Sequence, residues 1–316
     1  MSETTVLGID LGKTSCRARL RVLALASPVR LSEGPWDAAG PGAGGLAAGT
    51  SGVEAALDAI DAVISTLPNG LDGVSRVGVG VAGADSNREA AHGLAAALAV
   101  RLGADVMVVS DVVAAHAGAL GGRAGTILVA GTGAVAYRLD VAGHLTRADG
   151  WGIWLGDFGS GRWIGQEGLR RVLRARDGVG TPTTLEHPAL AAAGTLEALP
   201  RYVAQDAAPE RRLAAFAPAV LAAAEQGDTV AQAITTEAVA YLTETATACA
   251  APGEPLAVVG GLTTSAFFAS RLTEALRARG VAPVDPLADA TDGAILIATD
   301  ATLPHAALAV HAGAPA

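Results

Sequence analysis

The chain has 316 residues, of which 51% are hydrophobic and 3% aromatic, and its formal net charge at pH 7 is −9. This length allows two ordinary domains or one large one, with a core built mainly from small aliphatic side chains. The negative charge argues against a general nucleic-acid-binding surface, which needs a basic face, and no apolar run is long enough to predict a transmembrane helix.

The two cysteines, Cys16 and Cys249, lie far apart and do not form a CxxC spacing. Buried free thiols in a reducing cytoplasm are the favoured interpretation, ahead of a disulfide or a metal-ligand role. The N-terminus begins an apolar strand almost at once and lacks the charged and apolar regions of a signal peptide. We therefore expect a soluble, cytoplasmic protein.

The first elements are predicted to be two antiparallel strands. Residues 6–10 are mostly apolar, and from 15 to about 26 arginines alternate with apolar residues, which is the period of a strand. A dinucleotide-binding fold would have a helix there instead. Residues 34–52 are rich in glycine, alanine and proline, and we interpret them as a mobile loop, either a plain connector or a segment that closes on a small substrate.

Helices and strands then alternate, and the order of strand, glycine-rich turn and strand restarts in the second half. This order predicts a largely parallel sheet with one antiparallel hairpin, and two related lobes. The further strands are predicted at 74–82, 105–109, 126–130, 134–140, 256–259 and 281–285. The helices are predicted at 53–67, 88–102, 112–120, 167–176, 186–190, 196–205, 211–225, 229–250, 265–279 and 290–300.

A glycine-rich turn follows the first strand and contains Asp10, Gly12, Lys13 and Thr14. Glycine lets backbone N–H groups approach an anion closely, and threonine adds a hydroxyl. Asp10 supplies a carboxylate suited to Mg²⁺, directly or through water, and Lys13 is placed to lie near a transferred phosphate. Considered alone, the turn is explained equally well as a capped hairpin with an exposed lysine.

A second turn of the same kind, Gly131-Thr132-Gly133, follows the strand at 126–130. Two such turns that face one another would grip the phosphates of a nucleotide, which is the layout of a two-lobed phosphotransferase. Gly260 and Gly261 follow a later strand and precede a helix, where an adenine or ribose can lie against the backbone. Such strand-glycine-helix turns are common, so the stronger indication is the order of the three glycine motifs along the chain.

Asp111 follows the apolar strand at 105–109 and opens a helix. Its carboxylate is thus predicted at the carboxyl edge of the sheet, where ligands of α/β proteins bind, and there it can accept a proton from a sugar hydroxyl. The alternative is a helix N-cap, for which aspartate is a preferred residue. The flanking glycine turns favour the catalytic base.

Three of the four tryptophans lie in the segment that runs from Asp149 to Gly165. Gly150, Trp151 and Asp157 would offer a sugar an apolar ring face and a carboxylate acceptor. The alternative is that the tryptophans are core residues, which we prefer for Trp163 and leave open for Trp151.

Taken together, these motifs resemble the superfamily of sugar kinases, hexokinase, Hsp70 and actin. LGIDLGKTS is similar to its first phosphate motif, LVAGTGAVAYRL to its second, and VVGGLTTS to its adenosine motif. Within this superfamily, DGWGIWLGDFGSGRWIG and VVSDVVAAHAGAL resemble the N-acetylglucosamine kinase and BadF/BadG/BcrA/BcrD ATPase family. The resemblance covers nearly the whole chain.

The resemblance implies an α/β protein with the two-lobed actin-like ATPase (ribonuclease H-like) fold, with mixed sheets and an ATP cleft between the lobes. We expect an N-terminal lobe at 1–118, completed by a closing helix at 290–304. The C-terminal lobe is expected at 119–289, followed by a tail at 305–316.

The resemblance also implies an ATP-dependent amino-sugar kinase that acts on the 6-hydroxyl of N-acetylglucosamine, with ATP and Mg²⁺ as cofactors. Asp111 would be the catalytic base and Asp10 the metal ligand. The partners expected are the sugar and a second copy of the chain in a homodimer, without nucleic acid or membrane. The residues implied to bind the nucleotide are Gly12, Lys13, Thr14, Gly131, Thr132, Gly133, Gly260 and Gly261. The residues implied to bind the sugar are Thr132, Gly133, Gly150, Trp151 and Asp157.

The chain departs from the family pattern near the sugar. Ala134 replaces a serine, Phe158 replaces a glutamate, and residues 40–52 lack the usual asparagine. The alternatives are therefore a kinase for glucosamine or N-acetylmuramic acid, or a BadF-type ATPase without sugar kinase activity. An activator ATPase would need paired cysteines for an iron–sulfur cluster, and a repressor would need a helix-turn-helix before the first strand. A sugar sensor on the same fold remains a further alternative.

Overall fold

The computed structural model describes residues 3–24, 30–31, 36–46, 51–67, 71, 73–205 and 208–315. The chain divides into two compact units. The first unit comprises Met1–Ala124, Leu139–His144 and Pro286–Ala316, and the second comprises Gly125–Arg138 and Leu145–Asp285. The beginning and the end of the chain therefore belong to the same unit.

The first unit is built on a mixed sheet in the order β11-β6-β5-β1-β2-β3, with β4 paired to β2. β1 pairs antiparallel with β2 and parallel with β5, so the predicted hairpin beside a parallel sheet is confirmed. The strands are β1 (Glu3–Leu11), β2 (Ser15–Ala24), β3 (Arg30–Leu31), β4 (Trp36–Pro41), β5 (Val74–Val81), β6 (Asp105–Val109) and β11 (Val310–Ala312).

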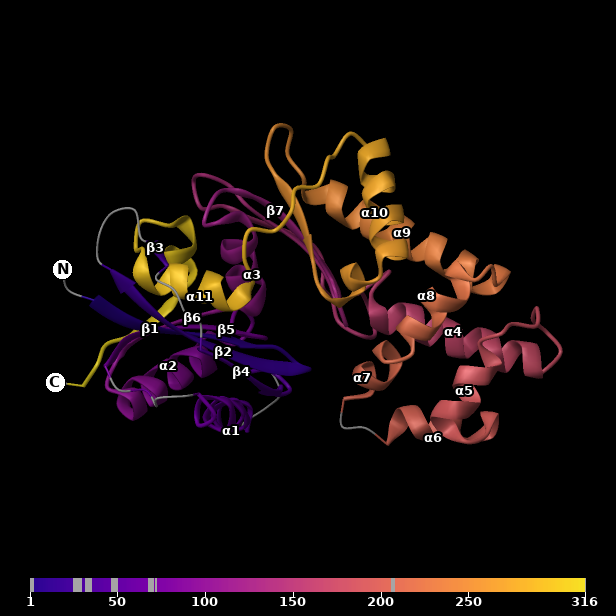
Figure 1. The fold of residues 1–316 in the computed structure, drawn as a ribbon, viewed down its shortest axis with the longest axis horizontal. Coiled ribbons are helices and arrows are strands. Elements are labelled where there is room, and N and C mark those ends of the chain that lie inside the picture. The colour runs from indigo at the N-terminus through magenta and orange to yellow at the C-terminus, as the bar shows by residue number, and fades with distance from the viewer. Residues whose placement is uncertain are drawn as a thin grey trace. The chain divides into compact units, whose positions relative to one another are not determined.

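Helices cover both faces of this sheet. Helices α1 (Gly52–Ile64) and α2 (Arg88–Leu102) lie on one face, and α3 (Asp111–Leu120) and α11 (Ala290–Thr299) lie on the other (Figure 1). Because both faces are covered, the central strands are almost wholly apolar, as in other parallel sheets. The short helix η3 (Pro304–Leu308) precedes β11.

Glycines allow α11 to pack unusually closely. A Cβ atom placed on Gly78 of β5 would lie 1.9 Å from the carbonyl oxygen of Ala294, and one on Gly118 of α3 would lie 1.9 Å from that of Asp289. No side chain fits at either position. The closing helix of the sequence is thus held directly against the sheet formed by the N-terminal strands.

The alternating arginines of β2 have a structural role in this packing. Arg19 donates to Asp292 at 2.6 Å and to Asp289 at 3.1 Å, and Arg21 donates to Asp292 at 3.1 Å. These ion pairs are largely buried and link β2 to the start of α11.

The second unit contains a sheet in the order β10-β7-β8-β9, in which β10 and β7 are parallel. Its core contains Trp163, which is 8% exposed and packs edge-on against Tyr241, so the predicted core role of this tryptophan is confirmed. The strands are β7 (Gly125–Ala130), β8 (Ala134–Leu139), β9 (Leu145–Asp149) and β10 (Leu256–Val259). The helices are α4 (Gly161–Arg176), α5 (Glu186–Ala193), η1 (Leu196–Ala198), α6 (Leu199–Ala204), α7 (Pro209–Ala214), α8 (Ala217–Glu225), α9 (Thr229–Cys249), η2 (Gly261–Thr264) and α10 (Ala266–Ala278).

Several predicted elements of the second unit differ from those observed. The strand β9 was missed because its residues are mostly exposed and lack apolar alternation. Helix α4 begins six residues before the predicted start, and the predicted helix at 211–225 is two helices, since Pro218 belongs in the first turn of a helix and not in its interior. Residues 281–285 form only an isolated bridge, between Val284 and Ala257.

In the first unit, two segments interpreted as loop or tail are structured. Residues 36–41 of the predicted mobile loop form β4, whereas 34–35 and 47–50 lie outside the described residues. The predicted tail contains η3 and β11, and β11 pairs antiparallel with β6. Both cysteines are buried and free, as predicted.

Candidate active site

Asp10 and Arg17 face each other across the β1–β2 hairpin. They are register partners, and Arg17 Nη2 donates to Asp10 Oδ2 at 2.7 Å. Asp10 is only 8% exposed, and this burial raises the pKa of its carboxyl, while the guanidinium of Arg17 opposes the rise. The hairpin register places Arg17 beside Asp10, a contact that the alternating arginines of the sequence do not predict.

The turn after β1 is closed by a hydrogen bond from Gly12 N to Ser15 O at 2.9 Å. A Cβ atom on Gly42 would lie 2.3 Å from Gly12 O, so the backbone after β4 packs directly on this turn. Gly12 itself has room, since its nearest neighbour would be 3.6 Å from a Cβ atom. Position 12 therefore does not need glycine for steric reasons, since a Cβ atom would fit there and the backbone is not left-handed.

Asp111 is the first residue of α3, and the neighbouring Ser110 fills the capping position. The hydroxyl of Ser110 accepts from Val113 N at 3.4 Å, and the Asp111 carboxylate accepts a local bond from Val112 N, at 3.0 Å. The N-cap of α3 is therefore Ser110 and not Asp111.

The carboxyl of Asp111 has a raised pKa. Burial raises its pKa to about 6, helped by the negative charges of Asp10 and Asp85 and opposed by the positive charge of Lys13. The charges of Asp10 and Lys13 therefore act on the Asp111 carboxyl. A carboxylate with a pKa near the working pH is suited to general base catalysis. Asp85 lies in the turn after β5 and was not singled out from the sequence.

The second glycine turn lies in the second unit between β7 and β8. Gly131 N donates to Gly133 O at 3.0 Å, while Gly131 O and Thr132 O accept from the first two residues of α4, at 2.8 and 3.1 Å. Gly260 has a φ of 113°, and a Cβ atom there would lie 2.5 Å from Ala130 O, so the third motif lies against the second. At Gly131 and Gly261, by contrast, a Cβ atom would fit, and the backbone of neither residue is left-handed.

The carboxylate of Asp157 lies beside Gly133. Its Oδ1 accepts from Ala134 N at 3.3 Å, and both oxygens lie 3.2 Å from the Cβ position of Gly133. Asp157 and Asp149 are the two non-glycine residues with positive φ among the described residues, at 58° and 59°. Asp149 stabilises the left-handed conformation of Asp157, since its carboxylate accepts from Asp157 N at 2.8 Å and from Phe158 N at 2.9 Å.

Trp151 is exposed, unlike Trp163. It is 68% exposed and lies between Gly150 and Gly152, both of which have positive φ. The guanidinium carbon of Arg147 lies 4.3 Å above the centre of the Trp151 ring. An exposed indole held by a cation is available to a ligand and is not part of the core.

No group of three or more potential metal-ligating side chains occurs within the part of the chain that the structure describes. A Mg²⁺ ion that uses one or two carboxylates together with substrate phosphates does not require such a group, and Asp10 fits that role. The same described residues include no helix long and apolar enough to cross a membrane.

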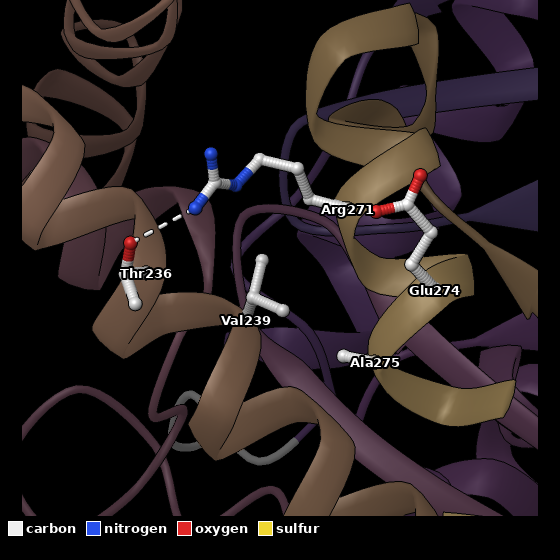
Figure 2. Close-up of a pocket in the computed structure, with 5 residues that line it drawn as sticks. All are labelled: Thr236, Val239, Arg271, Glu274 and Ala275. Atoms are coloured by element: carbon white, nitrogen blue, oxygen red, sulfur yellow. Dashed lines mark hydrogen bonds between the residues drawn. The ribbon is translucent and has the colours of Figure 1, made fainter. Parts of the chain in front are cut away.

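A separate pocket of about 420 Å³ lies between α9 and α10 (Figure 2). It is lined by Thr236, Val239, Arg271, Glu274 and Ala275, and Arg271 Nη2 donates to Thr236 Oγ1 at 3.1 Å. None of the residues singled out from the sequence lines it.

Comparisons with known proteins agree with these motifs. The model of the BadF/BadG/BcrA/BcrD ATPase family matches residues 7–298. The chain is similar to the N-acetylmuramic acid/N-acetylglucosamine kinase of Clostridium acetobutylicum, with 30% identity over 55% of this chain and 58% of the relative. It is also similar to the glucosamine kinase of Vibrio cholerae, with 33% identity over 57% of this chain and 58% of the relative. The matched part thus spans less than two thirds of each of these relatives.

Among solved structures, the chain is similar to a protein of Chromobacterium violaceum described as a candidate N-acetylglucosamine kinase. The TM-score is 0.72 and the identity 28%, over 93% of this chain and 98% of that one. With the two sheets described above, this likeness confirms the expected actin-like ATPase fold class.

Proposed function

Because the chain belongs to the BadF/BadG/BcrA/BcrD ATPase family, we propose that it is an ATP-dependent amino-sugar kinase. The acceptor proposed is the 6-hydroxyl of N-acetylglucosamine. The names of the similar kinases support an amino sugar, although the chain matches only part of their length. A small-molecule sugar and a second copy of the chain, in a homodimer, are the partners proposed, and light scattering of the purified protein tests the assembly.

One observation carries this proposal, namely three glycines that the fold does not require. Gly12, Gly131 and Gly261 each have room for a Cβ atom and no left-handed backbone, and each belongs to a different predicted nucleotide motif. A missing side chain at such a position leaves backbone N–H groups open to close approach by a phosphate or a ribose. This favours a bound nucleotide over the plain-turn interpretation.

In the proposed reaction, the chain mainly positions groups and balances charge. Asp111, ionised above its raised pKa, accepts the proton of the sugar hydroxyl. Asp10 would hold Mg²⁺, and the ion would supply positive charge that offsets the charge of the phosphates. Lys13 and Thr14 bind phosphate from the first turn, and Gly131, Thr132 and Gly133 bind it from the second.

The proposed sugar site combines a carboxylate with an exposed ring. Asp157 accepts hydrogen bonds from the sugar hydroxyls, and the exposed ring of Trp151 covers the C–H face of the sugar. Ala134 contributes only its N–H group, which already donates to Asp157. A site that lacks the serine hydroxyl suits other amino sugars as well, so glucosamine and N-acetylmuramic acid are the alternative acceptors.

The test is a coupled assay of ADP release over a panel of sugars. We expect sugar-stimulated release that is largest with N-acetylglucosamine, and a fall in kcat of about 10²-fold to 10⁴-fold for Asp111→Asn. Asp58→Asn, an exposed aspartate of α1, serves as the control and should behave like the parent. No stimulation by any sugar, or an Asp111→Asn variant as active as the parent, would refute the proposal.

The alternative from a different class is an ATPase of this family without sugar kinase activity. It would hydrolyse ATP at the same rate with and without sugar. An activator with an iron–sulfur cluster is opposed by the cysteines, because both are buried and burial raises the pKa of Cys16 to about 12. Iron analysis of the purified protein distinguishes this class.

A further inference from the structure

Arg162 is a buried cation that connects two parts of the second unit. It is the second residue of α4 and only 4% exposed. Its backbone N–H donates to Thr132 O in the second glycine turn, at 3.1 Å. Its guanidinium Nη2 donates to Gly156 O and, at 3.5 Å, to Asp157 O. A single residue therefore contacts both the glycine turn and the loop that carries Asp157.

Asp157 is clamped from both sides. Its Cα atom lies between two peptide groups, and Arg162 binds the carbonyl oxygens of both, those of Gly156 and Asp157. Asp149 binds the N–H groups of the same two peptides, at 2.8 and 2.9 Å. Aspartate adopts a left-handed backbone reluctantly, and this clamp stabilises it at a φ of 58°.

The burial of a guanidinium here needs an explanation beyond packing. The hydrogen-bond acceptors of Arg162 described above are neutral, as is Gln166 Oε1 at 2.9 Å, and its Nε atom is buried with no partner among the described residues. Burial lowers the pKa of Arg162, while the negative charges of Asp157 and Asp149 oppose that effect. A buried charge is costly, and a well-packed apolar side chain would serve packing better.

We propose that Arg162 is a positioning residue for sugar binding, which holds the Asp157 carboxylate beside Gly133 by clamping the two peptides that flank it. The inference rests on the proposed function of Asp157 as the sugar acceptor. The left-handed backbone directs the carboxylate to Ala134 N and the Cβ position of Gly133, and the link to Thr132 keeps the glycine turn in register with it. If the clamp is lost, the carboxylate moves and the sugar loses its acceptor.

The test is a double-mutant cycle on Arg162 and Asp157, measured as KM and kcat with N-acetylglucosamine and, separately, with ATP. Arg162→Lys keeps the charge but loses the planar guanidinium that directs Nη2 at both carbonyl oxygens, and Arg162→Gln removes the charge. We expect either variant to raise the sugar KM about tenfold and to leave the ATP KM within about twofold, because a charged hydrogen bond of ordinary strength is lost. In the Asp157→Asn background the same change should add less than about twofold.

The matched control is Gln166→Ala, which removes one acceptor of the guanidinium and leaves the clamp in place. Its sugar KM should stay within about twofold of the parent. Additive effects of the Arg162 and Asp157 changes would overturn the inference. So would Arg162 variants that lose sugar and ATP binding together or fail to fold, since that is the signature of a purely structural role. No sugar-stimulated ADP release from the parent would instead refute the proposed function itself.

Discussion

At the scale of single residues, the proposed chemistry depends on the charges around Asp111. Burial, with the negative charges of Asp10 and Asp85, raises the pKa of this carboxyl to about 6, and the positive charge of Lys13 opposes the rise. The base is therefore ionised at neutral pH and protonated in mild acid. A pKa in this range lets Asp111 accept a proton in the reaction without being permanently neutral.

The pH dependence of kcat/KM tests this balance. We expect activity to be retained above about pH 6 and to fall below it, because protonated Asp111 cannot act as a base. Lys13→Gln removes a positive charge that lowers this pKa, so the acid limb should move to higher pH, in addition to any loss of rate. Lys13→Arg, which keeps the charge, should leave the limb in place. If the acid limb of the Lys13→Gln profile stays in place or moves to lower pH, this prediction is wrong.

At the scale of elements, glycines have two distinct roles that the sequence does not separate. Those at helix and strand crossings, such as Gly78 and Gly118, allow backbones to touch. Those in the predicted nucleotide motifs, such as Gly131 and Gly261, have open space around them. Substitution by alanine should therefore affect stability in the first group and function in the second.

We expect Gly131→Ala and Gly261→Ala to fold with unchanged or slightly higher stability, by up to about 1 kcal/mol, since alanine reduces the entropy of the unfolded chain. Their affinity for ATP should fall, because a methyl group occupies the space left for the ligand. Gly118→Ala should lower the free energy of unfolding by about 3 kcal/mol, since its methyl group collides with α11. Thermal unfolding and ATP titration measure the two effects. A stable Gly118→Ala variant, or normal ATP affinity in both of the others, would contradict this division.

At the scale of the whole molecule, the end of the chain completes the unit that the beginning starts. Residues 286–316 supply α11, η3 and β11 to the first unit. Within it, His305 of η3 and His116 of α3 are fully buried, and His116 Nδ1 lies 2.8 Å from His305 Nε2. This contact joins the C-terminal segment to the helix that begins with Asp111.

The histidine pair makes stability depend on pH. Burial, helped by the charge of His116, lowers the pKa of His305 to about 3, well below its ordinary value of 6.5. The folded state thus binds this proton less readily than the unfolded state, so the stability is complete above pH 6.5 and is lost as the pH falls towards 3. We expect the free energy of unfolding to fall by roughly 1 kcal/mol per pH unit between pH 6 and 4, and this fall should be absent in His305→Gln. Denaturant unfolding of both proteins measures it, and equal slopes would contradict the expectation.

Much of this architecture follows from local sequence. The hairpin, the bounds of α2, β6 and β10 and the glycine turns were predicted correctly because apolar periodicity and glycine are local signals. The predicted tail was wrong because a three-residue strand such as β11 exists only through its pairing with β6. The strand at 36–41 was missed for the same reason, since the alanines, glycine and proline at 38–41 give no apolar alternation and β2 supplies the pairing.

By itself, the sequence determined the three glycine motifs, the position of Asp111 at a strand end and the family, because these depend on residue type and order. Only the tertiary structure decided which polar side chains meet. Trp151 and Trp163 lie in one motif, yet the first is exposed and the second is packed against Tyr241 of α9. Arg17, Asp149 and Arg162 gained their roles from hydrogen bonds to Asp10 and Asp157. Such contacts depend on backbone register and on left-handed residues, which no local pattern specifies.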